Sequence, residues 1–192
     1  LMKITIPDTV ERISYSAFTC CEKLVVVSLS KNLKSIESST FAGCELLESI
    51  ELPEGLEIIK DYAFMNCISL SNLELPSSLK EIGMNAFYEC KSIEEIIVPK
   101  NVTHISDSAF NGCINLETLS LVEGLEIIDS NAFSNCKKLK EIVIPNSVTR
   151  IGYGAFSECV GLEKIIIPFA SSKESEYGVI SFNSIFSRTA NV

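Results

Sequence analysis

The sequence has few of the groups on which catalysis at neutral pH depends. It contains a single histidine, His104, and no glycine-rich phosphate loop, HExxH pair or GxSxG elbow. The position of His104 varies between copies of the repeat described below, and in other copies it is Glu81, Ile127 or Arg150. Such a variable position indicates solvated surface rather than a catalytic or metal-binding residue. The sequence therefore predicts a protein that is not an enzyme and that has no cofactor.

Positive charge and long apolar runs are also scarce. The chain has 16 Lys and Arg residues against 25 Asp and Glu residues, for a net charge of -9. Because nucleic-acid-binding surfaces cluster Lys and Arg, nucleic acid is not an expected partner. No apolar run approaches the roughly 18–20 residues that span a bilayer, and the first residues do not resemble a signal peptide. We expect a soluble chain without membrane insertion, and a fragment or processed form, since it starts inside an incomplete repeat.

What the sequence does contain is a strict 23-residue repeat. A period in this range is typical of a solenoid, in which each coil buries its apolar side against its neighbours. The apolar content of 46% is ample for a continuous core. The repeating phenylalanines are Phe18, Phe41, Phe64, Phe87, Phe110, Phe133 and Phe156.

Cysteine follows the same period. Seven of the eight cysteines lie three residues after the repeating phenylalanine, and only Cys20 is outside the series. Equivalent residues of adjacent coils lie about 4.8 Å apart with parallel Cβ vectors, whereas a disulfide needs Cβ atoms about 3.8 Å apart. We expect a ladder of free core thiols, which fits a reducing compartment, an anaerobic habitat, or burial that prevents oxidation. The ladder consists of Cys21, Cys44, Cys67, Cys90, Cys113, Cys136 and Cys159.

Each copy of the repeat predicts one strand and several turns. Ile96 and Val98 alternate with outward residues and precede Pro99, a pattern typical of a strand with one buried face. Apolar residues at spacings of three around Phe87 and Cys90 predict a short helical turn. Equal repeat lengths bring the strands into register. We therefore expect an α/β repeat solenoid with one parallel β-sheet face, and with short helical turns and tight turns on its other sides.

The repeat resembles a known family. The string LxxLxLPxxLxxIxxxAFxxCxx is similar to the 23-residue leucine-rich repeat of the BspA-like (treponemal-type) class, and the similarity covers residues 2–168. The resemblance implies a leucine-rich repeat solenoid without enzymatic activity, of a kind often found in surface proteins of host-associated bacteria and parasitic protists that adhere to matrix proteins, host cells or other microbes. In residues 70–92 the motif positions are Leu70, Leu73, Leu75, Pro76, Leu79, Ile82, Ala86, Phe87 and Cys90.

The period fails after Pro168, and this sets the expected boundaries. Residues 1–168 are predicted to form the solenoid, with seven repeats and an N-terminal strand. Residues 169–192 are predicted to form a C-terminal segment with a polar loop over 169–178, a degenerate half-repeat over 179–187 and a tail. In the half-repeat, Ile180, Ile185 and Phe186 take the places of the Ile, Ala and Phe of the pattern. Such a modified end would cover the last coil, and a disordered tail is the alternative.

The outward positions of the predicted sheet are the best candidates for ligand binding. They vary between copies while the inward positions do not, because packing restricts only the latter. The face is acidic in the middle and becomes apolar and basic toward Val143, Lys164 and Ile166. It therefore predicts a protein ligand with a basic patch, for example a host or matrix protein, although for any single residue the charge could merely solvate the sheet. The candidate ligand-binding residues are Ser49, Glu51, Asn72, Glu74, Glu95, Ile97, Thr118, Ser120, Glu141 and Val143.

Two further motifs carry weaker alternatives. Glu51 and Glu74, on adjacent predicted strands, could share a calcium ion, but no EF-hand or similar loop supports this, and we predict no metal site. Asn101-Val-Thr103 is a glycosylation sequon, which matters only if a eukaryote secretes the protein.

These observations favour a non-catalytic protein-binding module, part of a cell-surface or secreted adhesion protein. Reduced cysteines and the missing signal peptide favour instead a cytoplasmic protein-interaction scaffold. A third hypothesis is a structural spacer that presents another domain.

Overall fold

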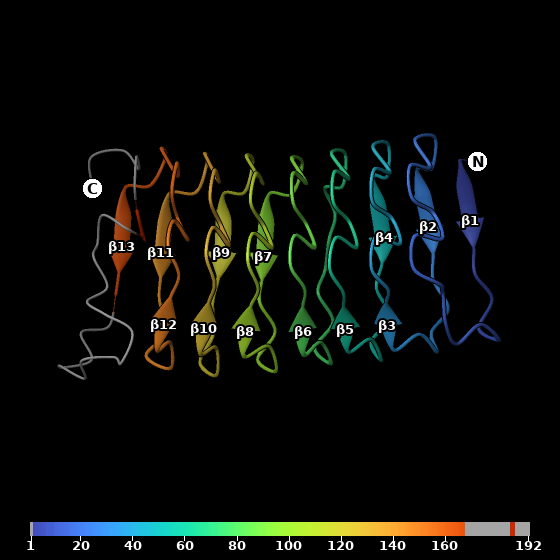
Figure 1. Ribbon diagram of the computed structural model, residues 1–192, viewed down its shortest axis with the longest axis horizontal. Helices are drawn as coiled ribbons and strands as arrows, with labels where there is room; N and C mark the ends of the chain where they lie inside the picture. Colours follow the sequence, from blue (N-terminus) through green and yellow to red (C-terminus); the bar gives the residue numbers. More distant parts are fainter. Residues whose placement is uncertain (1, 168–184, 187–192) are drawn as a thin grey trace.

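The computed structural model describes residues 2–167 and 185–186. The chain winds into equal coils, one for each copy of the repeat, that stack side by side along one axis, with β1 at one end and β13 at the other (Figure 1). Each coil places its strands at the same height as those of its neighbours. The predicted leucine-rich repeat solenoid is therefore confirmed.

Three-residue strands lie in a row along one side of the solenoid, which we call the first ladder, and they form three short parallel sheets of three, two and two strands. Their residues pair in register with the equivalent residues of the next coil, as in Ile4↔Val27 and Val27↔Ile50. Asn72 continues the ladder in the third coil through a single bridge to Ser49. The expected parallel strands are present, including the one at the N-terminal end, but they are divided among three sheets and do not form one. The strands are β1 (Lys3–Thr5), β2 (Val26–Ser28), β4 (Ser49–Glu51), β7 (Glu95–Ile97), β9 (Thr118–Ser120), β11 (Glu141–Val143) and β13 (Lys164–Ile166).

A second parallel ladder, which the sequence did not predict, lies below the first in Figure 1. It is one six-stranded sheet of two-residue strands. It forms because equal coil lengths hold every segment in register, so any extended residues after the corner pair with their counterparts. The expectation of a single sheet was therefore too narrow. The strands are β3 (Ser35–Ile36), β5 (Ile58–Ile59), β6 (Glu81–Ile82), β8 (His104–Ile105), β10 (Ile127–Ile128) and β12 (Arg150–Ile151).

The segment around the repeating phenylalanine, which we call the turn side, contains no helix within residues 2–167. Its N–H groups alternate in direction: Ala63 donates to Lys60 O in its own coil (3.2 Å), whereas Phe64 donates to Ala86 O in the next coil (2.8 Å). A continuous helix would direct all of them along the chain. The predicted short helical turns are thus replaced by turns that also bond between coils.

Two residues per coil in the turn side have positive φ, and these interrupt the helical path. Most are Ser, Asn or Gly, of which Gly and Asn adopt this conformation most readily. Cys20 lies at the position of Gly43, which explains why it stands outside the cysteine series. The first column contains Ser16, Ser39, Tyr62, Asn85, Ser108, Asn131 and Gly154, and the second contains Cys20, Gly43, Asn66, Glu89, Gly112, Asn135 and Glu158.

The core runs the length of the solenoid as a stack of phenylalanine rings. From Phe18 to Phe156 successive ring centroids lie 5.2–5.5 Å apart. Phe186 extends the stack by one ring, 5.6 Å from Phe156, and Ile185 O accepts the N–H of Phe156 at 3.1 Å. Ile185 and Phe186 thus take the places of Ala and Phe. Ile180 and the remainder of 169–192 lie outside the described residues, so those boundaries stay a prediction.

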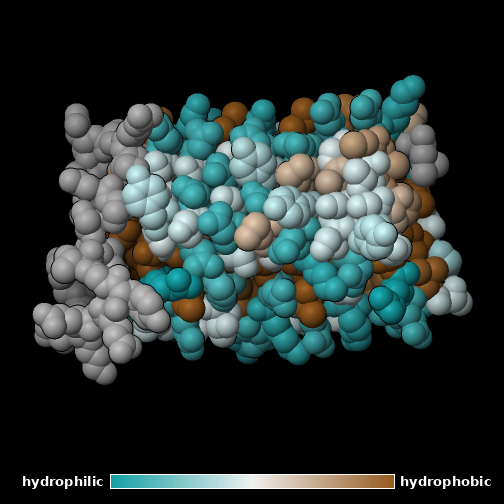
Figure 2. Space-filling view, viewed as in Figure 1, coloured by the Kyte–Doolittle hydropathy of each residue, from teal (hydrophilic) through white to brown (hydrophobic). Residues whose placement is uncertain are grey.

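The surface in the same view is largely hydrophilic along its upper and lower margins, with paler and tan residues in a band between them (Figure 2). In the part of the chain that the structure describes, no helix is long and apolar enough to cross a membrane.

Candidate functional site

The candidate residues lie at the two outward positions of the first-ladder strands, and at Asn72 and Glu74 in the third coil. The strand geometry separates them from the core: in β7, Ile96 is 1% exposed and Ile97 is 57% exposed. Exposed apolar side chains continue along the same column at Val143 and Ile166. The sequence pattern thus assigned the inward and outward positions of this ladder correctly.

A depression of about 750 Å³ lies over β2, β4 and the third coil. It brings together four of the predicted residues: Ser49, Glu51, Asn72 and Glu74. The other six, on β7, β9 and β11, lie further along the same side and do not line it. The predicted set is therefore divided into a recessed part and a continuation along the ladder.

The lining also includes Lys31, Glu54 and Pro76, which were not among the predicted residues. Lys31 and Glu54 occupy equivalent corner positions after β2 and β4, and Pro76 lies in the corner after Glu74. The sequence could have indicated these residues, because a corner residue that directly follows a strand at the depression lies at the edge of the depression. Glu51, Glu54 and Glu74 outnumber Lys31, and the depression is acidic.

The acidic residues of the first ladder differ in their partners. Lys164 Nζ lies 2.5 Å from Glu141 Oε1, and Lys138 Nζ lies 3.2 Å from Glu117 Oε1. Within the described residues, the carboxylates of Glu51, Glu74 and Glu95 make no hydrogen bond or ion pair. Among the outward positions of the first ladder, the unpaired carboxylates therefore lie on the second, third and fourth coils.

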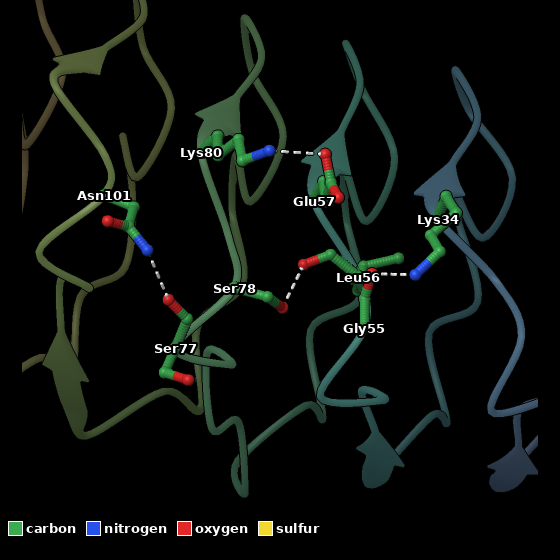
Figure 3. A network of polar contacts seen from close by, with 8 residues as sticks. All are labelled: Lys34, Gly55, Leu56, Glu57, Ser77, Ser78, Lys80 and Asn101. Carbon is green, nitrogen blue, oxygen red and sulfur yellow. Dashed lines mark hydrogen bonds and ion pairs between the residues drawn. The ribbon is translucent and has the colours of Figure 1, made fainter.

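Two carboxylates beside the second ladder are instead paired with lysines of the adjacent coil. Glu37 Oε2 accepts from Lys60 Nζ at 2.7 Å, and this hydrogen bond lowers the pKa of Glu37. Lys80 Nζ donates to Glu57 Oε2, also at 2.7 Å, and lowers the pKa of that carboxyl in the same way (Figure 3). Glu81, on the same ladder, has no ion pair within the described residues, so only some carboxylates of this ladder are paired.

The corners next to this ladder are held by further bonds between coils. Ser78 Oγ donates to Leu56 O at 2.6 Å, and Asn101 Nδ2 donates to Ser77 O at 2.9 Å (Figure 3). The polar residues of these corners therefore serve the stack. Asn101, the sequon residue, is one of them.

His104 lies on β8 and belongs to a charged cluster that sequence analysis missed. Its Nε2 atom lies 2.5 Å from Asp129 Oδ2, while Arg150 contacts Asp129 Oδ1 at 2.8 Å. Neither pair joins equivalent positions of adjacent coils, so both contacts run diagonally between coils. An alignment of the repeat copies therefore does not predict them. Among the described residues, no group of three or more His, Cys, Asp or Glu side chains is placed to hold a metal.

The geometry of the cysteine ladder indicates a structural role. All eight cysteines are free, as predicted. Each buried thiol donates to the phenylalanine carbonyl of the preceding coil, as Cys67 does to Phe41 O at 3.1 Å. Burial raises the pKa of Cys44 to about 12 and raises that of Cys90 as well. A nucleophilic role would require the thiolate, which burial disfavours.

Comparison with known proteins agrees with this geometry. The sequence pattern described as "BspA type Leucine rich repeat region" matches six copies within residues 1–114 and 57–185. The chain belongs to the BspA-type leucine-rich repeat family. Leucine-rich repeat proteins generally bind other proteins, and their repeats are generally non-catalytic. The recognition of the family from sequence is thus confirmed.

Solved structures include close relatives of this BspA-type chain. The leucine-rich repeat protein of T. pallidum is 32% identical, with a TM-score of 0.80 over 84% of this chain and 78% of that one. A leucine-rich cell surface protein of Faecalibacterium prausnitzii is 32% identical, with a TM-score of 0.62 over 86% of this chain. A leucine-rich repeat protein of Bacteroides ovatus is 29% identical, with a TM-score of 0.50 over 87%. The BspA-type chain spans 38% of the second and 55% of the third. No curated protein matches significantly.

Proposed function

We propose that the chain is a non-catalytic protein-binding module that recognises its ligand with the first ladder, and that it acts at the cell surface or after secretion. The observation that carries the proposal is the row of unpaired carboxylates at outward positions of three consecutive coils of the first ladder. Glu37 and Glu57, beside the second ladder, pair with lysines of the next coil, whereas Glu51 and Glu74 at the depression and Glu95 in the following coil have no ion-pair partner within the described residues. Uncompensated charge on a surface lowers stability and is useful when a partner supplies the opposite charge.

The ligand is a protein surface with a basic patch. Cationic groups would enter the depression opposite Glu51 and Glu74, and apolar groups would meet Ile97 and Val143 further along the ladder. Charge complementarity of this kind accelerates association and weakens as salt screens it. The cell-surface assignment draws on the F. prausnitzii relative, whose name includes that location.

The test is a charge reversal of Glu51, Glu74 and Glu95 to Lys. Binding to a panel of immobilised extracellular-matrix proteins is measured by surface plasmon resonance at low and high salt. We expect the association rate of the wild-type chain to fall with salt, and the triple variant to bind about tenfold more weakly. Unchanged capture by the variant would refute recognition through the first ladder.

The matched control reverses Glu45, Glu81 and Glu126, which are exposed, lie off the first ladder and make no ion pair within the described residues. Both triple variants change the net charge of -9 by the same amount. Equal losses in the two variants would show that only overall charge matters.

A cytoplasmic scaffold is the second candidate function, and the eight free cysteines favour it, since free thiols persist in reducing compartments. Antibody labelling of intact cells separates the two locations. A chain that is labelled only after permeabilisation would support the scaffold.

A further inference from the structure

Tyr62, on the turn side, occupies a backbone conformation that disfavours its large side chain. Tyr62 has a φ of 61°, a conformation that disfavours bulky side chains. The six equivalent positions hold only small residues: Ser16, Ser39, Asn85, Ser108, Asn131 and Gly154. The Tyr62 side chain is not part of the core, because the residue is 37% exposed. Because the backbone of Tyr62 is strained and its side chain is not buried in the core, packing does not explain this tyrosine, and the exposed ring is a candidate for binding.

Large side chains also occupy neighbouring turn-side positions of the third and fourth coils. Met84 is 42% exposed, and its sulfur accepts a hydrogen bond from Tyr62 Oη at 3.7 Å. Met65 and Tyr88 occupy equivalent positions in these two coils and are half-buried. We call Tyr62, Met65, Met84 and Tyr88 the turn-side patch. Other coils place mostly Ser, Asp, Asn, Ala or Thr at these positions.

The charges around the patch are negative. Asp61 adjoins Tyr62, and its Oδ1 accepts the N–H of Met84 at 2.8 Å. Asp107 follows in the next coil, where its Oδ1 accepts from Ser108 Oγ at 2.6 Å. Neither carboxylate has an ion-pair partner in the described chain, because Lys60 pairs with Glu37, and Lys91 is paired within its own coil.

We propose that the turn-side patch is a second interaction site, independent of the first ladder, that takes a polypeptide segment in which an arginine lies next to an aliphatic side chain. A guanidinium stacks on the face of a tyrosine ring and pairs with a carboxylate, so Tyr62 and Asp61 suit it together. Methionine adapts to aliphatic side chains of different shapes, and Met65 and Met84 supply that contact. Tyr, Met and Arg are also enriched in protein interfaces.

The chain contains only three methionines, which makes the test specific. Isotope-labelled methionine methyl groups report on Met65 and Met84 in the patch, and on Met2, which lies at the N-terminal end of the first ladder. The probe is the acetylated and amidated pentapeptide Ala-Leu-Arg-Leu-Ala, titrated to millimolar concentration and followed by NMR. We expect the Met65 and Met84 signals to shift while Met2 stays constant. The same peptide with glutamate in place of arginine should give no shift.

Two variants decide whether Tyr62 serves binding or the fold. Tyr62→Asn introduces the residue found in the same column at positions 85 and 131, and we expect it to weaken peptide binding by about tenfold while the unfolding midpoint stays equal or rises, because strain is removed. Tyr153→Ser, which removes a tyrosine that is 67% exposed in another coil, should leave binding unchanged.

The proposal is overturned by any of four results. These are no shift of Met65 and Met84, equal shifts with the glutamate peptide, full binding by Tyr62→Asn, or a lowered midpoint in that variant. The last result would mean that the Tyr62 ring stabilises the stack.

Discussion

At the scale of the residue, the repeating cysteine combines two roles. Its side chain fills the core, and its thiol donates to a phenylalanine carbonyl of the preceding coil, as Cys90 does to Phe64 O at 3.1 Å. The same carbonyl already accepts the N–H of Cys67 in its own coil at 3.1 Å. A buried carbonyl oxygen can accept two hydrogen bonds, and the thiol of Cys90 supplies the second donor to Phe64 O. This explains why the position is cysteine rather than alanine.

We expect Cys90→Ser to be more stable than Cys90→Ala by about 1 kcal/mol, because serine keeps a donor for Phe64 O and alanine does not. Urea unfolding of the two variants measures the difference. If cysteine served packing alone, the serine hydroxyl would be buried without benefit, and the order would reverse.

At the scale of the element, ion pairs between coils support the second ladder. Glu37 has two partners, Lys60 and the hydroxyl of Ser35, whose Oγ donates at 2.8 Å. Lys60 contributes most to the lowered pKa of Glu37. A folded-state pKa below the ordinary value of 4.5 means that the pair stabilises the fold above that pH. The stabilisation is then lost as pH falls through the folded-state pKa.

Glu37→Gln should therefore lower the free energy of unfolding at pH 7 by about 0.5 kcal/mol, and the loss should vanish when the pH is well below the folded-state pKa of Glu37. Urea unfolding across this range measures it. Glu81→Gln, on the same ladder, is the control, since Glu81 has no ion pair among the described residues and should show no such pH dependence. An equal loss at all pH values would contradict the ion-pair account.

At the scale of the whole molecule, stability depends on contacts between nearest coils, so an end coil is only as stable as its cover. Phe186 is 5% exposed and stacks on Phe156. It thus contributes the contacts that an eighth coil would provide.

Phe186→Ala should remove about 3 kcal/mol of packing from the last coil, and amide hydrogen exchange there should accelerate. Exchange at Ile144 and Gly152 reports on the last coils, while Phe64 and Gly83 serve as the internal control. Acceleration of both groups by the same factor would indicate that the solenoid opens as a single unit.

Much of the solenoid could be predicted from the sequence. The Phe and Cys columns and the parallel strands of the first ladder followed from the period of the repeat. The second ladder and the alternating bonds of the turn side did not. The N–H of Phe64 donates to Ala86 O of the next coil, and this bond depends on the position of that coil. The residues of a single repeat do not contain this information, so their spacing suggests a helix.

The sequence by itself determined the length of each coil, the register of the stack and the residues that enter its core, because equal spacing returns equivalent side chains to the same height. The tertiary structure decided which outward charges are neutralised. Glu37 meets Lys60, Asp129 meets His104 across a diagonal, and Glu51 faces a depression without a partner. The Glu37–Lys60 pair joins equivalent positions and can be read from a column of the repeat, whereas the diagonal His104–Asp129 contact and the depression depend on side-chain directions that no column records.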